Sequence, residues 1–519
     1  MSVLSYAEIH YRPRFIPSAV FRRQPEVISD IPRRIEPESP LPVCILIKDA
    51  DRFPIVLEAV IVHITYPEGR ERIARFPYQN EKIVSPVWWD VINIMPEYTG
   101  TALIDVYIQV VSGKQRKLIR IDNYHDTTHM PFTVHIAESP LPGGEGWYHG
   151  DIHCHTMYTA DQIEFGAPLE MTAVAAYALG LRWIAVTDHS YDLDDREGSY
   201  ADRDPFLRKW WLMRGESELL SRSLILIPGE EVTCRTKNGL NCHMLSLNSD
   251  TFIHGSGDSG ERGLDTRTEK SVGEAVSACV EGGGIACAAH PFERIPIFER
   301  MLLKRGPWTK EDLETPGIVG MQFYNGIRDA GFRAGKEMWI KFLLSGRKMY
   351  AFGGSDAHGD FNRFRGIGVP FWSVVESPRF TFGSVRTVVH ADVLSRDSIF
   401  QSLGAGHAVV TDGPFIDLAV HSGETRAIPG DTCGHGEVTV ELSCTSSTEF
   451  GPLKHCRLVG GLFTKNTERT LASMDSKDDR IFIENTRPID TTNLRYLRAE
   501  CETAQGNVCF TNPVWVSGN

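Results

Sequence analysis

The stretch HGDIHCHT, residues 149–156, raises the question on which the fold and function of the chain depend. It reads as a short strand, and residues two apart in a strand point to the same face. The imidazoles of His153 and His155 should therefore face one way, with Cys154 packed on the other side. Such a pair occurs by chance in a chain with 18 histidines. Its meaning depends on partners elsewhere in the sequence.

Length and composition indicate a soluble protein of several domains. The 519 residues predict two to four domains, and the 42% hydrophobic content is sufficient for sizeable cores. A net charge of −13 argues against a general nucleic-acid binder. We find neither a signal peptide nor an apolar run long enough to span a membrane. The 11 cysteines form no CxxC pair, which favours reduced thiols and a cytoplasmic location.

The pattern of residues changes three times along the chain. Residues 1–38, rich in Pro and Arg, predict an extended arm, and residues 39–146 alternate as in an antiparallel β-domain. From 147 to 415 short apolar runs alternate with helical stretches, which predicts β-α units around a parallel sheet or barrel. Alternation returns over 416–519 and predicts a second β-domain.

Acidic and imidazole side chains recur where the predicted strands of the 147–415 region end. Loops at the carboxyl ends of parallel strands are where such folds build their sites. The set mixes imidazoles with carboxylates and contains no thiolate, which suits Zn, Mn or Fe with positions open to water. It is too large for one ion, so we expect two to three divalent ions. The candidate ligands are His153, His155, Asp161, His189, Glu231, His243, His290, Asp356 and His358.

The order of these motifs resembles the polymerase and histidinol phosphatase (PHP) superfamily of metallohydrolases. The segments HCHT, VTDHS, PGEEVT, AAHP and GGSDAH carry the resemblance. A narrower resemblance, to the CehA/McbA-like branch, rests on DQIEFGAPL, AVVTDGPF and the closing YLRAECETAQGNVCFTNPVWV. The resemblance implies an α/β fold, a distorted (β/α)7 barrel with three metal sites, flanked here by N-terminal and C-terminal β-sandwich-like domains.

The resemblance also implies how the ligands are shared among the ions. One ion would be held by His153, His155, Glu231 and Asp356, a second by Glu231, His243 and His290, and a third by Asp161, His189 and His358. Glu231 would bridge two ions, and the G-x-E spacing selects it over Glu230. The chain departs from the family pattern at Asp161, which falls one residue late, so Glu164 is the alternative ligand there.

These observations predict a metal-dependent hydrolase that uses metal-activated water on a small-molecule substrate, most simply a phosphate mono- or diester. Hydrolysis of a carboxyl ester, carbamate or amide at the same centre is the alternative. An inactive regulatory domain and a carbohydrate-binding protein explain the ligand set less well. Besides Glu231, the catalytic candidates are Asp188, to orient a histidine, and Arg294, to meet an anionic substrate. A turn-forming role for Asp188, a surface salt bridge for Arg294 and a homo-oligomer remain open.

Overall fold

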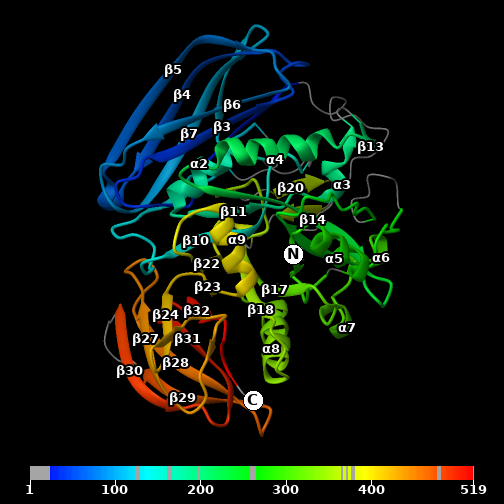
Figure 1. The fold of residues 1–519 in the computed structure, drawn as a ribbon. Coiled ribbons are helices and arrows are strands. Elements are labelled where there is room, and N and C mark those ends of the chain that lie inside the picture. The colour runs from blue at the N-terminus through cyan, green and yellow to red at the C-terminus, as the bar shows by residue number, and fades with distance from the viewer. Residues whose placement is uncertain are drawn as a thin grey trace.

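The computed structural model describes most of the chain, with side chains. The residues it describes are 24–123, 129–159, 166–196, 199–257, 265–295, 297–363, 366–369, 372–375, 380–475 and 481–517. In Figure 1 a blue β-sandwich, a green and yellow central region and a red and orange β-sandwich follow one another from top to bottom. Among the described residues, no helix is both long and apolar enough to cross a membrane.

The N-terminal sandwich consists of two sheets whose alternating apolar side chains meet in one core. The smaller sheet contains β1 (Glu26–Asp30), β3 (Leu41–Lys48) and β6 (Val87–Ile94). The larger contains β2 (Arg34–Ile35), β4 (Ile55–Thr65), β5 (Glu71–Ile83), β7 (Gly100–Ser112), β8 (Gln115–Arg120) and β9 (Phe132–Ile136). A short 3-10 turn, Pro67–Gly69, joins β4 to β5. Strands β1 and β2 lie in the segment for which the sequence predicts an extended arm.

The central region is built on seven strands that carry the candidate site. They are β10 (Trp147–His155), β11 (Trp183–Val186), β14 (Ile225–Arg235), β15 (Asn241–Leu247), β16 (Ile285–Ala289), β17 (Ile318–Asn325) and β18 (Tyr350–Gly354). Neighbours in space follow this same order, and β19 (Ala357–His358), directly after β18, pairs with β10. The last of these strands is thereby brought back beside the first.

The central region also contains helices between its strands. They are α2 (Leu169–Leu179), α3 (Ser190–Leu193), α4 (Arg208–Leu220), α5 (Val272–Glu281), α6 (Ile297–Leu302), α7 (Lys310–Leu313), α8 (Ala330–Leu344) and α9 (Arg396–Ala405). Local sequence explains several of their ends, because Ser271 and Thr309 each form a capping box and Asp329 caps α8.

The prediction of a helix-rich, distorted (β/α)7 barrel is wrong. Strands far outnumber helices, and β14–β15 and β15–β16 pair antiparallel instead of parallel. The reason is local: residues 236–240 are too few for the crossover that a parallel pair requires, so β14 and β15 form a hairpin. The sheet also does not end at β10, because β22 (Arg386–His390) pairs with β10 antiparallel and extends it.

Beyond β22 the same sheet runs on into the C-terminal part of the chain. It continues through β23 (Ala408–Thr411), β32 (Val508–Thr511), β31 (Leu494–Thr503), β28 (Leu453–Leu462) and β29 (Thr467–Asp475), with β26 (Thr432–Cys433) and β33 (Val514–Val516) at its side. The large sheet therefore contains strands from both sides of the predicted boundary at 415.

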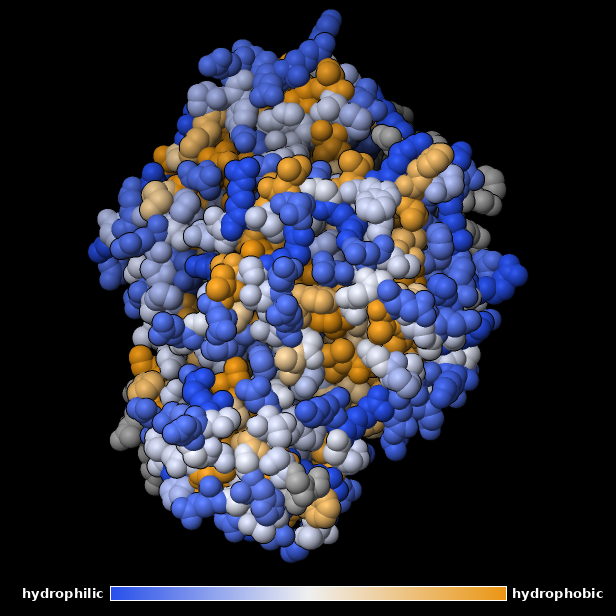
Figure 2. Space-filling view, in the orientation of Figure 1, coloured by the Kyte–Doolittle hydropathy of each residue, from blue (hydrophilic) through white to orange (hydrophobic). Residues whose placement is uncertain are grey.

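A second, four-stranded sheet packs on this extension and completes the C-terminal sandwich. Its strands are β24 (Phe415–Ser422), β25 (Thr425–Ala427), β27 (Glu437–Thr445) and β30 (Phe482–Asp490). Two small pairs, β12 (Asp195–Arg196) with β13 (Ser199–Arg203) and β20 (Gly366–Val369) with β21 (Trp372–Val375), lie in the central region. All 11 cysteines are buried free thiols. Figure 2 shows hydrophilic and hydrophobic residues interspersed over one face of the molecule.

Candidate metal centre

The ends of the central strands bring eight of the nine predicted ligands into one buried cluster. His153 and His155 come from β10, Glu231 from β14 and His243 from β15. His189 follows β11, His290 follows β16, and Asp356 and His358 follow β18. The ninth, Asp161, and its alternative Glu164 lie outside the described residues. Each of the eight is at most 8% exposed, so the cluster is withdrawn from solvent.

The carboxylate of Glu231 lies at the centre of the cluster and meets five imidazoles. Its Oε2 is 3.4 Å from Nε2 of His153 and of His155, and 3.1 Å from Nδ1 of His189. Its Oε1 is 2.8 Å from His243 Nδ1 and 3.1 Å from His290 Nε2. Each carboxylate oxygen thus faces a different group of rings, which is the arrangement expected of a bridging ligand.

Asp356 is the second carboxylate of the cluster. Its Oδ1 is 3.1 Å from His153 Nε2 and 3.3 Å from His155 Nε2. Two compact sets of ligand atoms result, each within 4.8 Å: His153, Glu231, His290 and Asp356 form one, and His155, His189 and His358 form the other.

This grouping differs in two members from the one that the family resemblance implies. His155 joins His189 and His358 because its ring stacks on His358 at 4.1 Å and lies 4.4 Å from His189. His290 joins the set that contains Asp356, although its Nε2 is also close to Glu231.

Electrostatics within the cluster couples the two carboxylates to the rings. Burial opposes charge on His155, but Asp356 and Glu231 outweigh it and raise its pKa to about 10. Burial alone would raise the pKa of Glu231, yet His243 and His153 hold it well below its usual range. Burial would also raise the pKa of Asp356, but His153 and the other rings lower it well below its usual range. Both carboxylates are therefore ionised within a buried site.

Two of the candidate ligands have an unusual backbone conformation. His290 has φ of 26° and Asp356 has φ of 55°, in the left-handed region that few residues other than glycine adopt. Such conformations are held by their surroundings and gather at functional sites. Here His290 directly follows β16, Asp356 lies between β18 and β19, and both side chains meet His153.

A polar chain on β17, formed by Gln322 and Asn325, contacts the candidate ligands. Gln322 Oε1 lies 3.2 Å from His153 Nδ1 and accepts the backbone N–H of His290 at 3.1 Å. Its amide donates to Asn325 Oδ1 at 3.0 Å, and Asn325 donates to Asp356 Oδ2 at 3.0 Å. A register shift between Gln322 and Tyr324 lets residues three apart face the site. Tyr324 instead donates to Asp412 at 2.6 Å, away from the cluster.

Asp188, predicted as a catalytic candidate, has a different role. Its Oδ1 accepts the backbone N–H groups of Thr156 and Thr159 at 2.7 and 2.8 Å, and its Oδ2 accepts the Thr156 hydroxyl. It therefore fixes the turn after β10, and acts on His155 only through Thr159, whose Oγ1 is 3.2 Å from His155 Nδ1. The alternative interpretation, a turn-forming aspartate, describes it better.

Arg294 is exposed, whereas another arginine reaches the cluster. Arg305 is 7% exposed, and its guanidinium lies 3.1 Å from His243 Nδ1. The Asn241 amide donates to Leu303 O at 3.0 Å and holds the segment that precedes Arg305. No motif marks Arg305 in the sequence, because it lies 15 residues after His290 in a segment without regular structure. A small pocket lined by His243, His290, Glu293 and Arg305 opens at this side of the cluster.

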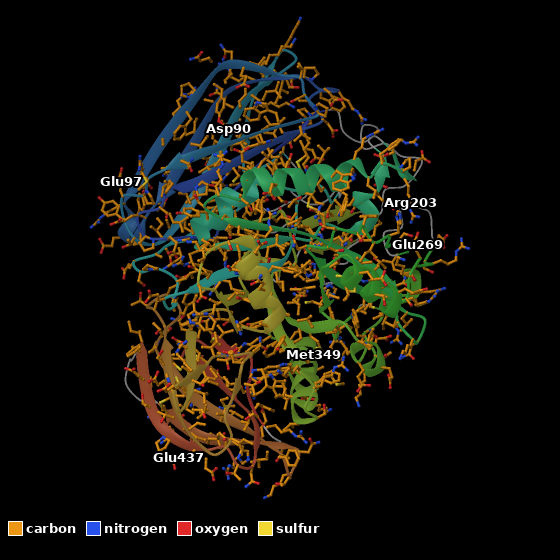
Figure 3. All side chains as sticks on the ribbon, viewed as in Figure 1. Asp90, Glu97, Arg203, Glu269, Met349 and Glu437 are labelled. Atoms are coloured by element: carbon orange, nitrogen blue, oxygen red, sulfur yellow. The ribbon has the colours of Figure 1, made fainter. Side chains whose placement is uncertain are left out.

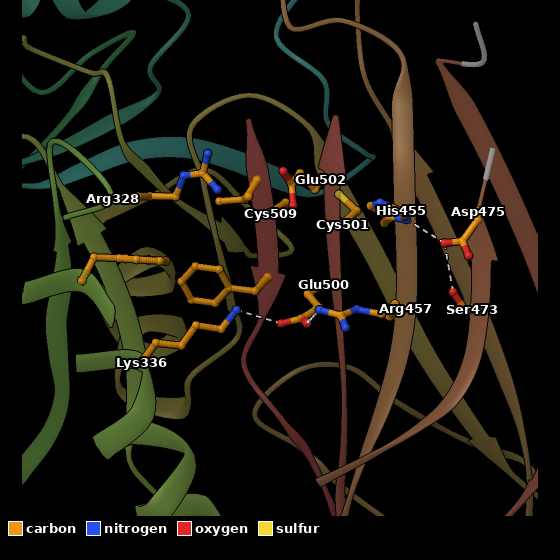
Figure 4. Close-up of a pocket in the computed structure, with 13 residues that line it drawn as sticks. Arg328, Lys336, His455, Arg457, Ser473, Asp475, Glu500, Cys501, Glu502 and Cys509 are labelled. Carbon is orange, nitrogen blue, oxygen red and sulfur yellow. Dashed lines mark hydrogen bonds and ion pairs between the residues drawn. The ribbon is translucent and has the colours of Figure 1, made fainter. Parts of the chain in front are cut away.

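Other polar contacts lie away from the cluster. Arg203 pairs with Glu269 and, at 2.8 Å, with Asp194, which ties the segment after His189 to the one before α5 (Figure 3). A cavity of about 430 Å³ lies between α8 and the C-terminal sheet, where Lys336 donates to Glu500 at 2.8 Å (Figure 4). Neither place includes a candidate ligand set.

Comparisons with known proteins add little to this description. No family model and no curated protein matches the sequence. Among solved structures, a glycosyl hydrolase family 2 member from Bacteroides cellulosilyticus matches at 10% identity and a TM-score of 0.16, over 95% of this chain and 63% of that one. A β-D-mannosidase from Dictyoglomus thermophilum matches at 8% identity and a TM-score of 0.23, over 94% and 67%. Scores this low carry no argument about fold or activity.

Proposed function

We propose that this chain is a metal-dependent hydrolase whose substrate is a small phosphate ester. The observation that carries the proposal is the buried carboxylate of Glu231, shared by five imidazoles beside Asp356. A core-packing role does not account for two ionised carboxylates and a ring of imidazoles withdrawn from solvent, because buried charges are normally paired or coordinate metals. The order of motifs along the chain supports membership in the PHP superfamily as part of the same proposal.

The donor set fits divalent cations. The Nε2 atoms of His153 and His155 lie 3.1 Å apart, and both face the same carboxylate oxygens. Two ring nitrogens at this distance cannot both donate to each other, so a cation between them and the carboxylates explains the convergence. Nitrogen and oxygen donors without thiolates suit Zn, Mn or Fe, as the sequence indicates.

The chain's own residues would hold these ions in two connected sets. His153, His290 and Asp356 would hold one ion, His155, His189 and His358 another, with Glu231 between them and His243 on its far oxygen. Ions bound there would supply Lewis acidity and activation of water for hydrolysis. Gln322, Asn325 and Glu293 would keep the rings and Asp356 in position, since Glu293 Oε2 lies 3.3 Å from His290 Nδ1.

Arg305 favours an anionic substrate. It places a guanidinium beside His243 at the side where the small pocket opens, and guanidinium groups suit the geometry of phosphate oxygens. We therefore propose that Arg305 binds a non-bridging phosphate oxygen and orients the ester toward the ligand cluster.

The test combines metal analysis with a matched panel of substrates. Purified protein should contain two to three ions per chain, and removal by a chelator should abolish hydrolysis of 4-nitrophenyl phosphate and bis(4-nitrophenyl) phosphate. Re-addition of Zn, Mn or Fe should restore it. 4-Nitrophenyl acetate and an aryl carbamate carry the same leaving group without the phosphate charge. If the protein hydrolyses the acetate and the carbamate but neither phosphate ester, the phosphoesterase proposal is wrong and carboxyl-type hydrolysis replaces it. If the protein contains no metal and its activity does not respond to a chelator, both metal-dependent activities are rejected.

A further inference from the structure

The segment directly after His358 leaves the cluster and enters the N-terminal sandwich. Gly359 has φ of 70°, and a Cβ there would lie 2.3 Å from Ala167 N, so only glycine allows this sharp exit. Phe361, two residues on, is fully buried in a core that it shares with Ile28 and Leu46 of the N-terminal sheet. A segment adjoining the candidate site is thus packed into another domain.

Asp30, the last residue of β1, binds this segment through its backbone. Its Oδ2 accepts the N–H of Phe361 at 2.6 Å, and its Oδ1 accepts the N–H of Asn362 at 3.1 Å. The same Oδ1 also accepts the N–H of Ile31, the next residue, at 2.8 Å, and this bond fixes the orientation of the carboxylate. Asp30 is fully buried, so these bonds are not exchanged with water.

The two following side chains add further anchors in the same domain. The Asn362 amide donates to the carbonyl of Thr133 at 2.9 Å, and the Arg363 guanidinium pairs with Asp122 at 2.6 Å. Each residue from 361 to 363 therefore bonds to the N-terminal sandwich. A buried carboxylate that binds the backbone of this segment is unusual for a surface loop. It is expected for a segment that holds His358 in place within the cluster.

From these contacts we infer that Asp30 is a positioning residue of the metal centre, by which the N-terminal sandwich fixes His358 and with it the His155, His189 and His358 set. The inference rests on the proposed function. If the inference is correct, the N-terminal sandwich contributes to metal binding at the candidate site. Groups that orient metal ligands typically affect metal affinity by about 10–100-fold.

The test compares Asp30→Ala with Asp30→Asn and with Asp51→Ala as a control. Asp51 is exposed in the turn after β3 of the same domain, so its loss changes the charge equally without touching residues 361–363. Metal-free full-length proteins are titrated with Co²⁺, and stoichiometry, chelator competition and the visible absorption spectrum are recorded. Circular dichroism checks that each variant is folded.

Asp30→Ala should lose at least about tenfold in affinity for the ion of the His155, His189 and His358 set, with a changed Co²⁺ spectrum, and keep the ion of the set that contains His153, His290 and Asp356. Asp30→Asn retains one acceptor oxygen and should recover part of the loss, which also provides the test if the alanine variant does not fold. If folded Asp30→Ala binds every ion with wild-type affinity, the inference is wrong but the proposed function stands. The same holds for Asp30→Asn if only that variant folds. A wild-type protein that binds no Co²⁺ would instead contradict the proposed function.

Discussion

Glu230 and Glu231 are neighbours in β14, but their carboxylates lie on opposite faces of the strand. Glu231 meets the five imidazoles of the cluster, whereas Glu230 accepts the backbone N–H of Ile253 at 3.0 Å and the Ser190 hydroxyl at 3.1 Å. Both are buried, yet burial raises the pKa of Glu230 to about 8, whereas His243 and His153 hold that of Glu231 far lower. Two adjacent residues of one type thus offer a matched pair for experiment.

We predict that Glu231→Gln loses more than one bound ion and at least about 10² in turnover, because a single carboxylate serves two ligand sets. Glu230→Gln keeps the shape of a carboxyl that burial holds largely neutral, with an oxygen that can accept the N–H of Ile253 and an amide that can donate to the Ser190 oxygen, so its metal content and activity should stay near wild type. Elemental analysis and steady-state kinetics on both variants provide the measurement. Equal losses in the two variants would contradict a bridging role for Glu231.

Arg305 should act on substrate binding more than on metal binding. We expect Arg305→Met to raise KM for a phosphate ester by roughly 10–100-fold, the effect of removing a hydrogen bond to a charged group, with metal content unchanged. Arg294→Met is the control, because Arg294 is exposed and its replacement removes the same charge. If the Arg294 variant loses as much as the Arg305 variant, the effect is one of general charge and the assignment of Arg305 is wrong.

The membership of the buried cluster could be predicted from the sequence more completely than its surroundings. Several candidate ligands, among them His189 and His290, come just after an apolar run, and strand periodicity places His153 and His155 on one face. Gln322 and Arg305 gave no such signal. Gln322 faces the site together with Asn325 only because a register shift interrupts the alternation of β17. Arg305 comes from a segment whose course is decided by tertiary contacts such as that from Asn241.

The sequence pattern predicts the wrong direction of pairing between β14 and β15 for a physical reason. An apolar run such as that of β14 looks alike in a parallel and in an antiparallel sheet when both its faces are buried. The five residues between β14 and β15 favour a hairpin, yet the repeated alternation of strands and helices elsewhere suggested crossovers throughout. The continuation of the sheet from β22 into the C-terminal region is a matter of long-range pairing, which local patterns do not encode.

The support given by β17 can be tested without touching a ligand. Gln322→Leu removes the acceptor that faces His153 Nδ1 and the N–H of His290, so we expect metal affinity to fall by about 10–100-fold. Tyr324→Phe, on the same strand, removes a hydroxyl that faces Asp412 and should leave metal affinity unchanged. Competition with a chelator measures both. Unchanged affinity in a folded Gln322→Leu protein would show that the rings hold their positions without this contact.

The last prediction concerns pH and the buried carboxyl of Asp30. Burial, and secondarily Asp360, raise its pKa to about 7, against the opposing effect of Arg363. An unfolded aspartate titrates near 3.9, so between about pH 4 and pH 7 the folded protein keeps a proton that the unfolded chain has released. The stability that this proton contributes is complete below pH 4 and is lost as pH rises through 7. For a shift of this size the loss is on the order of 4 kcal/mol.

Asp30→Asn cannot ionise, so its stability lacks this dependence. We therefore expect wild type to have a larger advantage over Asp30→Asn at pH 5 than at pH 7, and this advantage to shrink further or reverse by pH 8. Thermal unfolding of the metal-free proteins, followed by calorimetry in the presence of a chelator, measures the difference without interference from metal binding. Asp51→Asn, which changes an exposed group, should differ from wild type equally at both pH values. A difference between wild type and Asp30→Asn that stays constant from pH 5 to pH 8 would mean that Asp30 titrates in the folded protein as it does in the unfolded chain.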